Sequence, residues 1–162
     1  MNRFIAPILL AVMLSACGLQ PLYSGGSKGA VATTLGSVSV ATIEGKSGWL
    51  MRNALTDRLG AQDSNAAQFR LVVTLDDRIE GFGVRADDTV TRERRTLRAR
   101  YQLISVATGK TVLDATAGSD AGIDVAGSEY ATIAGENSAL ENLTQKVADQ
   151  IVTRLSIYAR GE

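Results

Sequence analysis

The stretch VTRERRTLRARYQLISV, residues 90–106, carries the longest strand pattern in the chain. Its side chains alternate with the period of two that is typical of a β-strand with one buried face. One face carries Leu97, Ala99, Tyr101 and Leu103, whose side chains are largely apolar. The other face carries a row of arginines, Arg92, Arg94, Arg98 and Arg100. The stretch therefore predicts a long strand with a core on one side and a cationic surface on the other.

Shorter strand patterns lie on both sides of this long strand in the sequence. Residues 69–76 alternate apolar and polar side chains, and residues 37–43 do the same with many β-branched side chains. A polar loop from Gly81 to Asp88 separates the second strand from the long one. Thr108-Gly109-Lys110 predicts a tight hairpin turn into a fourth, antiparallel strand at residues 111–116.

Two segments have the three-to-four residue spacing of amphipathic helices. The first, residues 49–59, carries Met51, Leu55 and Leu59 on one stripe; Ser47 is its expected N-cap and Gly60 its expected C-cap. The second begins after Ser128 and carries a longer apolar stripe, made by Tyr130, Ile133, Leu140, Leu143, Val147, Ile151, Leu155 and Tyr158. Gly135 is the one position at which this helix could be interrupted.

The predicted order of elements is β-α-β-β-β-α, which defines an α+β fold. A helix between the first two strands allows them to be parallel neighbours, whereas short connections pair the others antiparallel. Two helices packed on one face of a four-stranded mixed sheet is the simplest arrangement that buries both apolar stripes. The arginine face of the sheet would then stay open.

The N-terminus has the pattern of a lipoprotein signal peptide. Arg3 is followed by an apolar run, Phe4–Leu14, that is too short for the roughly 20 residues that span a bilayer. Leu14-Ser15-Ala16-Cys17 forms a lipobox, and Cys17 is the only cysteine. Residues 1–16 are therefore an expected signal peptide, and Cys17 is the expected site of lipidation with acyl chains such as palmitate.

The expected mature chain divides into a tether and one domain. Residues 17–34 contain the lipidated cysteine and a Gly/Ser-rich stretch that predicts a flexible tether. Residues 35–160 are long enough for a single α/β domain with its own core. Such a chain would be held on a membrane surface through lipid.

The composition excludes several classes of function. The chain has no histidine, so Ser-His-Asp and Cys-His catalysis and the usual zinc sites are excluded. Its 17 basic and 17 acidic side chains give no global attraction for nucleic acid, and aromatic residues are few. Residues 25–29 contain glycine and lysine but lack the spacing of a phosphate-binding loop. We therefore expect a protein that is not an enzyme and that has no cofactor, no metal and no nucleic-acid partner.

The sequence Cys17-Gly18-Leu19-Gln20-Pro21-Leu22-Tyr23 resembles the mature N-terminus of the lipopolysaccharide-assembly lipoprotein family, LptE, in its alphaproteobacterial form. The resemblance continues at Arg52–Leu55 and in the closing segment Arg154–Tyr158. It departs at Ser24, where the family often has glycine. None of these motifs is a catalytic signature.

The resemblance implies a partner, a location and a fold. Members of the family form a complex with the outer-membrane β-barrel LptD, in which they sit as a plug, and they assist the delivery of lipopolysaccharide to the outer leaflet. The family fold is two helices on a four-stranded mixed sheet. Gly18 after the lipidated cysteine implies sorting to the outer membrane, with the domain facing the periplasm.

The arginine row is the candidate binding site. We hypothesise that Arg92, Arg94, Arg98 and Arg100 contact phosphates or carboxylates of lipopolysaccharide, or acidic groups of the barrel, because a guanidinium binds such oxygens in a bidentate manner. The alternative is a solvated face that protects the strand from edge pairing, with part of its charge neutralised by Asp76, Asp77, Asp87 and Asp88.

Two further alternatives stay open at this point. Trp49 is either an anchor for a partner or, as the sequence favours, a residue that packs at the edge of the core. The alternative function is a periplasm-facing lipoprotein that acts as a binding module for peptidoglycan or a small ligand. Such a module would need a concave pocket with converging polar groups.

Overall fold

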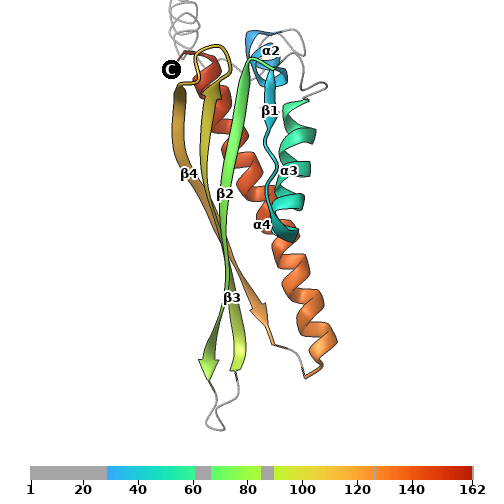
Figure 1. Ribbon diagram of the computed structural model, residues 1–162. Coiled ribbons are helices and arrows are strands. Elements are labelled where there is room, and N and C mark those ends of the chain that lie inside the picture. The colour runs from blue at the N-terminus through green and yellow to red at the C-terminus, as the bar shows by residue number, and fades with distance from the viewer. Residues whose placement is uncertain (1–28, 61–66, 85–89, 126, 162) are drawn as a thin grey trace, which may run out of the picture.

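The computed structural model describes residues 29–60, 67–84, 90–125 and 127–161. These ranges form three helices and four strands (Figure 1). The helices are α2 (Ala30–Gly36), α3 (Gly45–Leu59) and α4 (Glu129–Ala159), and the strands are β1 (Val38–Val40), β2 (Phe69–Val84), β3 (Val90–Ser105) and β4 (Thr111–Asp124). The fold is therefore α+β, as the sequence predicts, with one additional helix at the start.

The four strands form one mixed sheet in the order β1-β2-β3-β4. β1 and β2 are parallel, and they pair Val38 with Phe69 and Val40 with Leu71. β2, β3 and β4 are antiparallel neighbours, so β4 forms one edge of the sheet. The predicted strand topology is confirmed.

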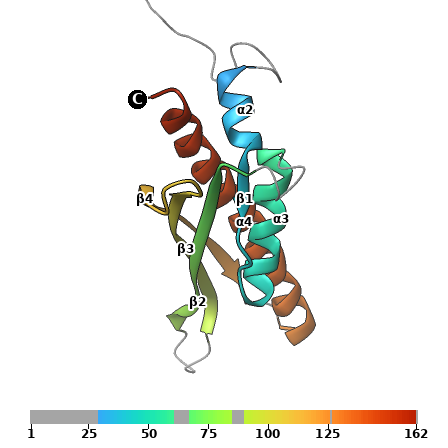
Figure 2. The same ribbon diagram turned by 45° about the horizontal axis from the view of Figure 1, so that its top comes forward.

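α3 and α4 lie side by side on the same face of the sheet (Figures 1 and 2). α4 contacts β3 and β4, whereas α3 contacts β1 and β2. The core lies between these helices and the sheet, and its largest fully buried side chains are Tyr101, Met51, Leu55, Leu71, Leu97, Leu103, Leu140, Leu143, Ile151, Leu155, Val38 and Val147. The two predicted apolar stripes thus meet the apolar face of β3, since burial of that surface is the main force for folding.

The first helix, α2, corrects the expected tether. Residues 17–34 are predicted to be flexible, but Ala30–Gly36 form a helix whose Val31 and Leu35 belong to the core. Val31 and Leu35 are four residues apart, so both reach the same side of one helical turn. Residues 17–28 of the expected tether lie outside the described residues. The folded part of the chain therefore begins earlier than the sequence pattern indicates.

The boundaries of two other elements also differ from the predictions. Gly81-Phe82-Gly83, expected to open a loop, belongs to β2, and the pairing with β3 continues to Val84 opposite Val90. α3 begins at Gly45 with Glu44 as its N-cap residue rather than Ser47. Its predicted end is confirmed, because Gly60 takes the left-handed conformation with φ of 64°.

α4 continues through Gly135 for 31 residues without interruption. A Cβ atom at Gly135 would lie 3.3 Å from Cγ2 of Ile123, so the glycine allows the helix to approach β4 closely. The apolar stripe is confirmed from Leu140 onward. It is wrong at the start of the helix, where Tyr130 and Ile133 are exposed because this part of α4 lies beyond the apolar half of the sheet.

None of the helices in the described ranges is long and apolar enough to cross a membrane.

The contact of α4 with the sheet should dominate stability. Leu143 is completely buried, so Leu143→Ala removes a core side chain and leaves a cavity that should cost about 2–5 kcal/mol of unfolding free energy. Urea denaturation measures this loss. The matched control, Glu141→Ala on the exposed face of the same helix, should change the unfolding free energy by about 0.5 kcal/mol or less. Equal losses in the two variants would contradict this description of the core.

Candidate functional site

The open face of the sheet carries all four arginines of the predicted row. Even-numbered residues of β3 point away from the helices, and Arg92, Arg94, Arg98 and Arg100 are each exposed. The odd-numbered residues Leu97, Ala99, Tyr101 and Leu103 are buried under the helices. The structure therefore brings the candidate residues together on one surface.

Two of these arginines are neutralised by aspartates of the neighbouring strand β4. Nε of Arg92 lies 2.9 Å from Oδ1 of Asp124, its partner in the register of the sheet. Nη2 of Arg100 lies 2.9 Å from Oδ2 of Asp114, which also accepts a hydrogen bond from Gln102. The sequence assigned this neutralising role to other acids. In the structure Asp76 pairs with Arg78, whereas Asp87 and Asp88 lie outside the described residues.

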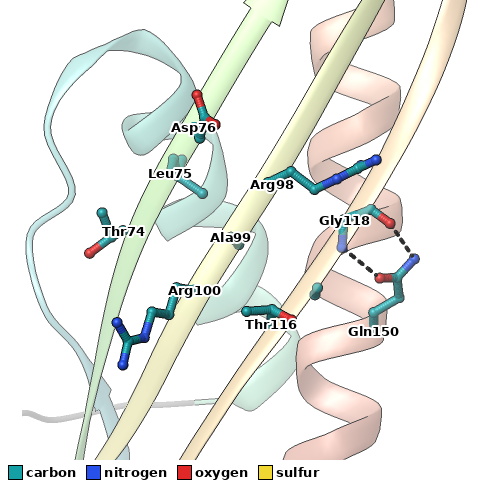
Figure 3. Close-up of a pocket in the computed structure, with 10 residues that line it drawn as sticks. Thr74, Leu75, Asp76, Arg98, Ala99, Arg100, Thr116, Gly118 and Gln150 are labelled. Carbon is teal, nitrogen blue, oxygen red and sulfur yellow. Dashed lines mark hydrogen bonds between the residues drawn. The ribbon is translucent and has the colours of Figure 1, made fainter.

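The other two arginines make no ion pair within the described ranges. The guanidinium of Arg94 lies over the ring of Phe82 at 5.2 Å from its centroid. Arg98 extends over Gly118 of β4 and donates from Nη1 to the carbonyl oxygen of Ser119 at 3.1 Å (Figure 3). Neither guanidinium is therefore held by an ion pair, although the register of the sheet places acidic residues of β2 opposite them, Glu80 opposite Arg94 and Asp76 opposite Arg98.

The ion pair of Arg100 changes the acidity of its partner. Hydrogen bonds from Arg100 and then from Gln102 stabilise the carboxylate of Asp114 and lower its pKa from 3.8 to about 2. The same hydrogen bond raises the pKa of Arg100 above its ordinary value. Asp114 therefore stays ionised, and its pair with Arg100 stays neutral overall, at any pH near neutrality.

A shallow cavity of about 590 Å³ lies between these two kinds of arginine. Arg98, Arg100 and Asp76 stand at its sides, and its lining also includes Thr74 and Thr116 (Figure 3). Gln150 reaches it from α4 at the edge of β4. The open face is therefore not flat: it offers a concave site with an unpaired cation beside it.

Arg95 is a charged residue whose position the sequence pattern did not single out. It points to the helix side, where its guanidinium binds Asp77 with distances of 2.7 and 2.8 Å and donates to the carbonyl oxygen of Glu136 in α4. Side chains of this pair are only 12% and 18% exposed. Arg95 has an odd residue number, whereas the arginines of the row have even numbers. The alternation of β3 therefore places Arg95 on the opposite face of the strand.

Trp49 is placed differently from the favoured expectation. Its side chain is 63% exposed on the first turns of α3, so it does not pack in the core. Helical spacing explains the error, because Trp49 lies two residues before Met51 and thus on the opposite side of the helix.

Metal binding has no support among the described residues. Nowhere in the part of the chain that the structure describes do three His, Cys, Asp or Glu side chains gather as metal ligands would. The expected lipidation site, Cys17, lies outside the described residues.

The fold and its open face define the class: an α+β domain with two helices on one face of a four-stranded mixed sheet and a charged surface on the other. The sequence matches the LptE family, described as "Lipopolysaccharide-assembly", over residues 35–155. The chain belongs to this family. No curated protein sequence matches the chain.

Solved structures share the fold. One is a lipoprotein from Caulobacter crescentus CB15, with a TM-score of 0.69, 24% identity, and coverage of 82% of this chain and 97% of that one. A minor lipoprotein from Acinetobacter baumannii has a TM-score of 0.58 at 14% identity, covering 75% and 89%. The rare lipoprotein B from Shewanella oneidensis has a TM-score of 0.58 at 12% identity, covering 76% and 95%.

Family membership gives the general role. The LptE family consists of non-enzymatic lipoproteins of the bacterial cell envelope that act in lipopolysaccharide assembly. The chain thus belongs to lipopolysaccharide assembly in general, and what its open face binds is a separate question.

The acidity of Asp114 tests the charge arrangement on this face. Arg100→Gln should raise the pKa of Asp114 from about 2 toward 3.8, because the strongest hydrogen bond to the carboxylate is lost. A pH titration of the side-chain carboxyl carbon by NMR measures this shift. A lowered pKa in the folded state stabilises the fold above pH 3.8, and this contribution is lost as the pH falls toward 2.

Gln102→Leu is the matched comparison, since Gln102 supplies the weaker hydrogen bond. It should raise the pKa of Asp114 by less than Arg100→Gln does. An unchanged pKa in Arg100→Gln would contradict the pairing.

Proposed function

We propose that this protein is an outer-membrane lipoprotein that plugs the LptD β-barrel, assists its assembly and helps deliver lipopolysaccharide to the outer leaflet. The observation that carries the proposal is the LptE family match over residues 35–155. The protein acts by binding and is not an enzyme. Its partners are the barrel and lipopolysaccharide.

In this proposal the anchor is lipid at Cys17, after removal of residues 1–16. Two or more acyl chains make a stable anchor, whereas one chain gives only marginal binding. Anchoring confines the domain to the periplasmic face of the outer membrane, so its encounter with the barrel becomes a local search.

The shape of the domain supports a plug. α2 and the C-terminal end of α4 lie at one end of the elongated molecule, and the paired ends of β2 and β3 lie at the other (Figure 1). Four of the six large, apolar and exposed side chains among the described residues belong to the distal parts of β2 and α4, namely Ile79, Phe82, Tyr130 and Ile133; the other two are Trp49 and Val106. Such side chains suit contact with the wall of a partner.

The open face is the proposed contact for the anionic groups of lipopolysaccharide. Arg94 and Arg98 would bind phosphates or carboxylates, because neither guanidinium is held in an ion pair within the described ranges and Asp76, which lies opposite Arg98, pairs with Arg78 instead. Arg92 and Arg100 would contribute less, since each is held by β4. The row of four thus becomes two binding arginines and two paired ones.

The alternative function is a binding module for peptidoglycan or a small ligand. The cavity of about 590 Å³ beside Arg98 is the observation that favours it, because it gathers several polar side chains in a concave site. A small ligand would be bound by the domain alone. The plug function instead requires a barrel.

Copurification tests the proposed function. After crosslinking in cells, the full chain should recover a large β-barrel as its main partner, because the plug is enclosed by that protein. Cys17→Ser should abolish lipid labelling and reduce recovery of the barrel, since the search is no longer local. Recovery of peptidoglycan fragments without a barrel would support the alternative and refute the plug.

Binding of purified lipopolysaccharide tests the arginines. Arg94→Gln together with Arg98→Gln should weaken binding roughly tenfold or more, because each charge-assisted hydrogen bond contributes about 1.5–3 kcal/mol. The effect should shrink at high salt, as exposed charges are screened. Surface plasmon resonance at two salt concentrations measures both quantities.

The matched control removes a pair without changing the net charge. Arg100→Gln combined with Asp114→Asn should leave binding nearly unchanged. If this control weakens binding as much as loss of Arg94 and Arg98, the division of the row into binding and paired arginines is wrong.

A further inference from the structure

The outer edge of β4 carries an unusual hydrogen-bonding arrangement. β4 is an edge strand, so alternate residues direct their backbone N–H and C=O groups away from the sheet. At Gly118 both groups are taken by one side chain: the N–H donates to Oε1 of Gln150 at 3.1 Å, and the carbonyl accepts from Nε2 at 3.3 Å (Figure 3). The amide of Gln150 thus pairs with β4 as the peptide group of a further strand would.

The rest of this edge is open in the same direction. The β3–β4 register is continuous from Arg92–Asp124 to Leu103–Leu113. Because backbone groups alternate along a regular strand, Thr116, Asp120 and Gly122 present theirs on the same edge as Gly118. An added strand could therefore pair with a row of backbone N–H and C=O groups, of which those of Gly118 are already bonded to Gln150.

A hollow accompanies this edge between β4 and α4. It has a volume of about 550 Å³ and begins beyond the bridge from Gln150 to Gly118. Its lining is dominated by small residues from the two elements, and comprises Ala121, Gly122, Ile123, Asp124, Gly135, Ser138, Ala139, Asn142 and Lys146. Small side chains allow another backbone to come close, and a strand edge beside a helix is a common seat for an extended peptide.

The charges along the β4 edge indicate what kind of segment could bind there. β4 contains three aspartates and neither lysine nor arginine, so a second copy of β4 would place like charges together. Asp120 has no ion pair within the described ranges, and a basic side chain opposite it would be favourable. Arg98 over Gly118 and Lys146 on the helix wall are the cations that face the groove, so a polybasic segment would be repelled.

We propose that the β4 edge from Thr116 to Asp124 is a docking site for an extended segment of a partner protein. The segment adds to the sheet as a fifth strand, displaces the Gln150 amide from Gly118, and has small uncharged side chains with one lysine or arginine opposite Asp120. Gln150 occupies the edge while the segment is absent and so blocks indiscriminate strand pairing. This surface borders the proposed contact of Arg98, which lies over Gly118, and is separate from that of Arg94.

A peptide-binding experiment tests the proposal on the full chain in detergent. The probe is fluorescein-labelled Thr-Val-Thr-Lys-Thr-Val-Thr, measured by fluorescence polarisation. It should bind the wild-type chain, and Gln150→Ala should bind it roughly tenfold more tightly, because the peptide no longer displaces two hydrogen bonds. Thr153→Ala, exposed on the same helix but outside the groove, should match the wild type.

Two control peptides separate backbone pairing from charge attraction. The same peptide with methylated backbone nitrogens keeps its charge but cannot donate, and it should lose binding. Replacement of its lysine by glutamate should weaken binding to the wild type and restore it in Asp120→Lys. Hydrogen exchange should show the peptide protecting the amides of Asp120 and Gly122.

Three results would overturn the proposal. The first is equal binding of the methylated peptide, which would mean charge attraction alone. The second is peptide protection at β2 instead of β4. The third is concentration-dependent self-association of Gln150→Ala without peptide, which would make a second copy of the chain the occupant.

Discussion

The two-sided alternation of β3 is the constraint on which the rest of the structure depends. Its odd-numbered residues meet α4 and its even-numbered residues meet solvent, so a shift of one residue would bury the arginines and expose Leu97 and Tyr101. Burying an unpaired guanidinium costs far more than any local preference can offset. The position of α4, the register of β4 and the open cationic face all follow from this one pattern.

The apolar core ends where Arg95 takes the place that an apolar residue would otherwise hold. Beyond this point the contact between α4 and the sheet is mixed: the buried Ile123 lies against Gly135, while Arg95 pairs with Asp77 and donates to the carbonyl oxygen of Glu136. Partial burial strengthens this pair relative to a surface ion pair, but a polar contact excludes water less completely than Leu97 does. The distal part of the molecule is therefore held differently from the core, and it leaves Ile79, Phe82, Tyr130 and Ile133 exposed.

The fold could be predicted from the sequence because the spacing of apolar residues within a short segment determines whether it forms a strand or a helix. The strands, the sheet order and both long helices follow from spacing of two or four residues. The misses have local causes as well. α2 has only seven residues, about two turns, and its Val31 and Leu35 lie in a stretch of small residues. Gly81-Phe82-Gly83 resembles a loop, although β2 continues through it and pairs Gly81 with Glu93 and Phe82 with Arg92. Trp49 shows that apolar character alone does not place a residue on the buried side.

The candidate site could be predicted only in part, because the pairing of its charges depends on cross-strand partners. The row of arginines was visible in β3, but which arginines are neutralised depends on the register of β4, whose aspartates lie 14 residues from Arg100 and 32 residues from Arg92 in sequence. Register places Asp124 beside Arg92, whereas Arg94 and Arg98 face Gly122 and Gly118, which have no side chain to pair with them. On the other side of β3 the register places Asp76 opposite Arg98 and Glu80 opposite Arg94, so the glycines of β4 leave these arginines without an acidic neighbour on one side only. Gly118 also allows the close approach of Arg98, whose side chain a Cβ atom at this position would meet. One residue thus shapes both the charged open face and the edge strand on which Gln150 bonds.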